Sequence, residues 1–135
     1  MKKSASMEGS EAISPVKDGE SERPIPHAWR DALASIVRAL AGGDYSLASL
    51  PDRFIKPAPE DAARIQAAIS DYGTTITELP AESWSTSVCI WYDPEWDALV
   101  DLWSIEEGRT DLVLHAKIKE KDQGYTYEIH LVYVP

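Results

Sequence analysis

The chain has 135 residues, an ordinary apolar share of 44% and a formal net charge of −10. This length fits one domain with one core, and the excess of carboxylates would repel phosphate backbones, which argues against a nucleic-acid-binding protein. The single cysteine leaves no partner for an intrachain disulfide. No apolar segment follows Lys2 and Lys3 to complete a secretory signal, and no apolar run is long enough for a membrane span. We therefore expect a cytoplasmic protein without disulfides or membrane contact.

Residues 1–24 are rich in Ser, Glu, Lys and Gly and poor in large apolar side chains. Such a composition cannot offset the entropy lost when a chain becomes ordered. We therefore expect a disordered tail over residues 1–24, followed by a single domain over residues 25–135.

Two amphipathic helices are expected in the first half of the domain. The first begins near Pro26, carries apolar residues three and four positions apart, and ends at Gly42 and Gly43. The second begins at Pro59, a favourable first-turn residue, and ends at Gly73. The connection between them, residues 44–57, is apolar enough that we expect it to pack on the domain.

Four later segments alternate with a period of two, which is typical of strands with one buried face. They cover residues 84–92, 95–103, 110–119 and 125–134. The short links between them predict an antiparallel meander, because parallel strands need longer crossovers. The expected fold is therefore α+β, with two helices packed on one face of a four-stranded antiparallel sheet.

The opposite face of this sheet would be displayed. Turn lengths predict a row in which Trp91 lies opposite Asp97, Asp97 opposite Lys117, and Lys117 opposite Glu128. The side chains expected on the displayed face are Cys89, Trp91, Asp97, Leu99, Asp101, Trp103, Val113, His115, Lys117, Glu128, His130, Val132 and Val134. Its mixture of tryptophan and carboxylates is typical of a contact surface, and the alternative is that another part of the chain, the 44–57 connection or the tail, covers it.

No catalytic, cofactor-binding or metal-binding motif is present. His115 and His130 are expected in one cross-strand row, so a small enzyme or metal protein centred on them, with Asp101 or Glu128 assisting, is the alternative hypothesis. Two histidines without a third ligand give only a weak match to zinc sites. Cys89 and His115 would lie about 9–10 Å apart, too far for a thiol dyad.

Several segments resemble a family of small uncharacterised bacterial proteins, with a likeness over residues 25–135. The resemblance implies no activity, substrate or catalytic residue. The small, acidic and aromatic-rich format is also similar to that of bacterial immunity proteins, which neutralise toxins. The segments that carry the family likeness are Ile25–Trp29, Gly43–Tyr45, Trp84–Trp91, Trp96–Trp103, Glu106–Leu112 and His130–Pro135.

The leading hypothesis is a non-enzymatic protein-interaction domain of the immunity or inhibitor type, with no cofactor. Its acidity would favour a basic protein partner; homodimerisation through the displayed face is a third hypothesis. The surface would lie on the displayed face or on the acidic loop 104–111. Its expected residues are Trp91, Asp97, Asp101, Trp103, Glu106, Glu107, His115 and His130.

Overall fold

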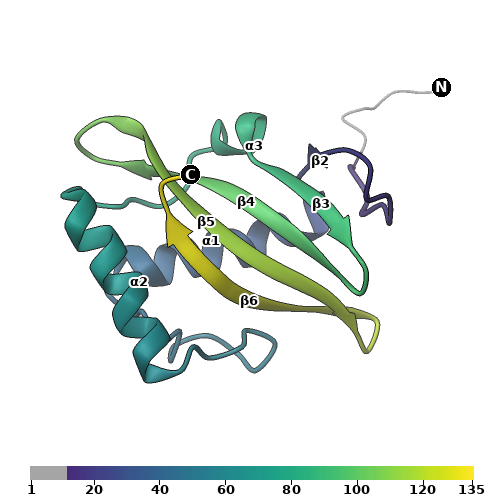
Figure 1. The fold of residues 1–135 in the computed structure, drawn as a ribbon, viewed down its shortest axis with the longest axis horizontal. Coiled ribbons are helices and arrows are strands. Elements are labelled where there is room, and N and C mark those ends of the chain that lie inside the picture. Colours follow the sequence, from purple (N-terminus) through teal and green to yellow (C-terminus); the bar gives the residue numbers. More distant parts are fainter. Residues whose placement is uncertain (1–11) are drawn as a thin grey trace.

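The structure, a computed structural model, describes residues 12–135. Within this range the chain forms three helices and one five-stranded antiparallel sheet (Figure 1). The helices are α1 (His27–Ala41), α2 (Pro59–Tyr72) and α3 (Ser83–Thr86). The strands, in spatial order, are β2 (Arg23–Pro24), β3 (Val88–Tyr92), β4 (Glu95–Ser104), β5 (Gly108–Lys121) and β6 (Gly124–Tyr133).

The α+β class and the antiparallel meander of β3 to β6 are confirmed. The expected count of four strands is wrong, because β2 pairs with β3 and adds a fifth. Residues 83–86, most of them expected to start a strand, form α3 instead. The Ser83 hydroxyl there donates to the Asp101 carbonyl oxygen, a long-range contact that the local sequence pattern does not predict.

The helices occupy different places on the sheet. Helix α1 passes behind it, while α2 lies beside β6 (Figure 1). Trp29 of α1 is fully buried, whereas α2 buries only Ile65 and Ile69 in the same core. Gly73 ends α2 with φ +82°, a left-handed conformation that favours glycine. The expectation that two helices pack on one face of the sheet is therefore only partly correct, because α1 covers that face and α2 flanks β6.

The pairing of β3 with β4 differs from the expected register by one residue. Trp91 lies opposite Trp96 and Cys89 opposite Ala98, so Trp91 and Cys89 belong to the core face. The expectation that both are displayed is wrong. Because side chains alternate along a strand, a shift of one residue moves the whole strand's pattern to the other face.

A bulge changes β6 in a similar way. The predicted row is confirmed at Asp97, Lys117 and Glu128. Beyond it the register shifts, so that His115 lies opposite Leu131 rather than His130. An extra residue in a strand reverses the faces that follow it. The displayed face therefore gains Leu131 and Tyr133, and Val132 turns into the core.

The N-terminal segment, residues 12–24, lies against the domain rather than apart from it. The Trp96 indole Nε1 donates to the Val16 carbonyl oxygen at 3.0 Å, and the Lys17 ammonium lies over the Trp91 ring at 5.3 Å. Lys17 also pairs with Glu120 at 2.7 Å. The part of the tail prediction that concerns residues 1–11 lies outside the described residues.

Candidate interaction surface

Both edges and one face of the sheet are covered. The N-terminal segment and β2 run along β3, and Gly19 approaches the Trp91 carbonyl oxygen so closely that a Cβ there would lie 2.9 Å from it. The segment 53–55 bonds to Tyr127 of β6, and α2 lies beside residues 129–132 of that strand. Helix α1 lies behind the sheet, whereas no helix or strand within residues 12–135 lies over the face toward the viewer in Figure 1. We call this surface the open face.

A row of apolar side chains crosses the open face at right angles to the strands. Val88 lies opposite Leu99, Leu99 opposite His115, and His115 opposite Leu131. We call these four residues the apolar row. Leu131 is 39% exposed although it is a large apolar residue. Val88, Leu99 and His115 are half-buried. A row of partly exposed, mainly apolar side chains often marks a contact site.

Two further rows flank the apolar row. On one side lie Ile90, Asp97, Lys117 and Glu128, in which Lys117 Nζ is 3.1 Å from Asp97 Oδ1. The same ammonium lies 3.0 Å from Glu95 Oε2, so Lys117 is already engaged by two carboxylates. On the other side lie Asp101, Val113 and Tyr133. The flanks are acidic overall, because the three carboxylates of Asp97, Glu128 and Asp101 outnumber the one ammonium of Lys117.

His115 lies at the centre of the apolar row. Its ring is 4.8 Å from the His130 ring and 6.5 Å from the Tyr133 ring, measured between centroids. Its Nε2 is 3.4 Å from Asp97 Oδ2 but is buried and makes no hydrogen bond. Burial lowers the pKa of His115, and this effect outweighs the opposite effect of Asp97, whose negative charge stabilises the protonated imidazole. The imidazole is therefore neutral near pH 7, which keeps the row apolar.

Within residues 12–135 the histidine pair has no third ligand. Among residues 12–135, no group of three histidine, cysteine or acidic side chains is placed to hold a metal ion. Asp101, expected to assist the pair, instead accepts a hydrogen bond from the Thr86 hydroxyl. Glu128 belongs to the neighbouring charged row. The geometry therefore adds no support to the metal or enzyme hypothesis.

The two tryptophans expected to be displayed have different environments. Trp91 is half-buried on the core face beneath Lys17, with its ring 4.6 Å from that of Trp96. Trp103 is half-buried where a bulge separates it from Asp101, and it lies opposite Arg109. Trp91 is therefore withdrawn from the candidate surface, while Trp103 remains near its end.

The acidic loop is braced rather than free. The Glu106 carboxylate accepts hydrogen bonds from the Thr75 amide at 2.9 Å, the Thr75 hydroxyl at 2.8 Å and the Thr74 hydroxyl at 2.9 Å. The Thr75 bonds, together with that of Thr74, lower the pKa of Glu106 to about 2. Glu106 thus ties the loop to the segment after α2, and Glu107 of the same loop is exposed.

We expect Glu106→Gln to make stability less dependent on pH. A carboxyl whose pKa is lower in the folded than in the unfolded chain stabilises the fold above its unfolded value of about 4.3. That stabilisation is lost as the pH falls toward about 2, the folded pKa. Urea unfolding of both proteins should show a gap near neutral pH that narrows below about pH 4.5. A gap that stays constant over this range would contradict the assignment.

Cys89 is expected to be unreactive in the folded chain. Burial raises its pKa to about 11 despite nearby Arg23, and thiols react as thiolates. At about pH 8, a disulfide reagent should label the folded protein on the order of 100-fold more slowly than the unfolded protein. Labelling in guanidinium chloride serves as the control, and equal rates in both conditions would show that Cys89 is accessible.

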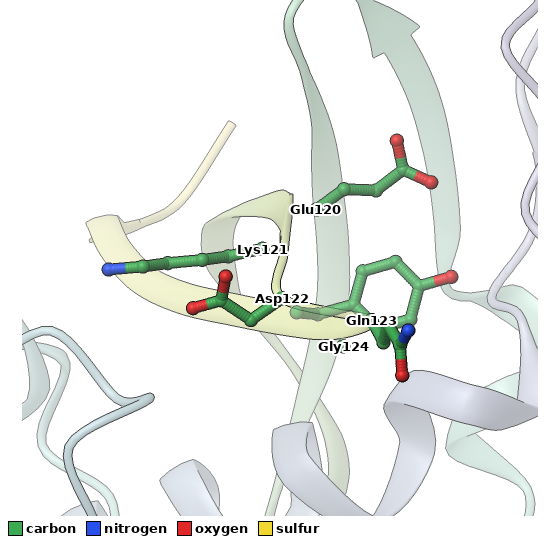
Figure 2. Close-up of a pocket in the computed structure, with 6 residues that line it drawn as sticks. Glu120, Lys121, Asp122, Gln123 and Gly124 are labelled. Carbon is green, nitrogen blue, oxygen red and sulfur yellow. The ribbon is translucent and has the colours of Figure 1, made fainter.

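Other hollows in the described part offer less chemistry. One lies at the β5–β6 turn, where neighbouring side chains such as Glu120 and Lys121 diverge from each other (Figure 2). Glu120 is also already paired with Lys17. A second lies between α2 and β6, beside Ile65 and Leu131, with a volume of about 90 Å³. That space suits a single side chain at most.

The sequence pattern does not predict every residue of the open face. The chain from Leu131 to Val134 is apolar at every position, so its alternation is compatible with either face. Only the bulge decides that Leu131 and Tyr133 are displayed. The alternation along β4 and β5 correctly predicts that Asp97, Asp101, Trp103 and His115 lie on this face.

The chain belongs to a family that is described as a domain of unknown function, DUF7668, whose model matches residues 37–135. The match spans the sheet from β3 to β6, α2 and the last part of α1. No curated protein and no solved structure matches the chain.

Proposed function

We propose that this member of the DUF7668 family is a non-enzymatic protein-interaction domain that docks its partner on the open face. The observation that carries the proposal is the apolar row on the one sheet face that no described element covers. In an antiparallel sheet with one buried face, the side chains on the solvent-facing side are ordinarily polar. Here Val88, Leu99 and Leu131 share one row, with the neutral imidazole of His115 between the two leucines. Burial of these side chains would drive association.

The negative charge of the open face favours a partner other than a second copy of this chain. The flanks carry three carboxylates, those of Asp97, Asp101 and Glu128, against one ammonium, that of Lys117, which is paired with Asp97. Two copies meeting face to face would bring carboxylates together, and the chain's net charge of −10 would add long-range repulsion. We expect a monomer by light scattering at high concentration. A partner whose contact surface has a basic rim would be attracted by the acidic flanks. One form of this function is the inhibition of a basic protein, as an immunity protein would perform it.

The test places a photo-crosslinking amino acid on two surfaces in cells of the source organism. Position Tyr133 lies on the open face, and Gln66 is an exposed residue of α2 that serves as the control. Crosslinked proteins are identified, purified and titrated against the wild-type chain and Leu99→Asp. We expect one partner at Tyr133 only, and binding to the variant weakened by at least about tenfold.

Two results would contradict the proposal. Equal crosslinking from Tyr133 and Gln66 would show that the open face is not a preferred surface. An identified partner that binds Leu99→Asp as tightly as wild type would show that the apolar row is not its docking site.

A further inference from the structure

The direction of the apolar row restricts the shape of what can dock on it. The row crosses four strands, from Val88 through Leu99 and His115 to Leu131. Neighbouring strands are about 4.8 Å apart, so the row is about 14 Å long. A docking element that follows the row must therefore run across the strands rather than along them.

An α-helix has the matching dimensions. It rises about 1.5 Å per residue, so about ten residues cover the row. Apolar side chains at positions i, i+3 or i+4, and i+7 form one stripe along such a helix and would meet the row from end to end. An added strand that paired with the sheet would need a free edge, and both edges are covered by the N-terminal segment, residues 53–55 and α2.

The charged side chains that flank the apolar row indicate which charge a docking helix would carry beside its apolar stripe. Asp97 and Glu128 lie on one side, and Asp101 lies on the other. Lys117 is the exception, and Asp97 and Glu95 already engage it at 3.1 and 3.0 Å. That pairing also uses the charge of Asp97, so lysine or arginine residues bordering the apolar stripe would meet Glu128 on one side and Asp101 on the other.

We infer that the partner docks through an amphipathic helix that lies across β3 to β6, with its apolar stripe on Val88, Leu99, His115 and Leu131 and basic residues on its borders. This inference rests on the proposed function and specifies the partner's docking element. The helix would form a third layer, on the side of the sheet opposite α1.

Designed peptides test the inference with the full chain and without a known partner. The first peptide has about 18 residues, with leucines at helical spacing and lysines on both borders. The second has the same composition in scrambled order, and the third carries glutamate in place of lysine. Fluorescence anisotropy measures binding of each labelled peptide, and amide shifts in NMR spectra of the wild-type chain locate the contact. We expect only the first peptide to bind with shifts on the open face, at least about tenfold more tightly than the other two.

A pair of variants separates docking from plain charge attraction. Leu131→Asp adds a carboxylate within the apolar row, and Ala67→Asp adds one on the exposed side of α2. Attraction by charge alone would strengthen with both variants. Docking on the row is expected to weaken by at least about tenfold with Leu131→Asp and to stay unchanged with Ala67→Asp. Circular dichroism checks that both variants fold. If Leu131→Asp does not fold, the amide shifts of the wild-type chain still show whether the first peptide binds on the open face.

Other outcomes would overturn the inference. Equal binding of the scrambled peptide, or tighter binding to Leu131→Asp, would show that charge rather than the helical stripe is responsible. If a native partner crosslinked at Tyr133 docks through a strand or loop, the helix inference fails while the proposed function stands. If no partner contacts the open face at all, the proposed function itself fails, and this inference with it.

Discussion

Replacing Trp29 by alanine is expected to lower the free energy of unfolding by about 3–5 kcal/mol, the usual cost of truncating a large buried aromatic side chain. Trp29 is fully buried. Its ring lies 5.1 Å from that of Trp96 and 5.7 Å from that of Tyr125, both at steep angles. The substitution would leave a cavity at the point where α1 meets the sheet, and chemical denaturation of both proteins measures its cost.

Trp103→Ala is the matched control for this substitution. The same side chain is removed there, but Trp103 is only half-buried and does not belong to the core cluster. We expect a clearly smaller loss, because less apolar surface returns to water. Equal losses at the two positions would contradict the view that α1 is anchored through Trp29.

The second large effect is expected from Ala116→Leu, which adds volume to the core instead of removing it. Ala116 lies opposite Ala98 on the core face, and both are fully buried. Interiors are close-packed, so a leucine at this position must displace neighbouring side chains. We expect a loss of about 1–3 kcal/mol in the free energy of unfolding.

Ala63→Leu provides the comparison, because Ala63 is exposed on α2 and leucine is nearly as good a helix former as alanine. Its free energy of unfolding should be almost unchanged. If Ala116→Leu were equally neutral, the space between α1 and the strands β4 and β5 would be looser than the burial of these alanines indicates.

The candidate surface was partly predictable because its centre depends on short-range regularities. The turn between β4 and β5 and the alternation along both strands place Asp97 opposite Lys117 and Leu99 opposite His115, as expected. The margins depend on single-residue events. The tight turn at residues 93–94 sets Trp91 opposite Trp96, and the bulge in β6 exchanges Val132 for Leu131. Each event reverses a face. Val88–Tyr92 and residues 131–134 are apolar at every position, so their alternation is compatible with either face.

The sequence by itself determined the α+β class, the two long helices with their proline starts and glycine ends, and the antiparallel order of the last four strands. These features follow from periodicity and turn chemistry, which act over a few neighbouring residues. Only the tertiary structure decided that Lys17 and Val16 pack against Trp91 and Trp96, that residues 83–86 form a helix, and that Leu131 faces outward. Those choices depend on contacts between residues far apart in the chain, where packing and long-range hydrogen bonds outweigh local preference.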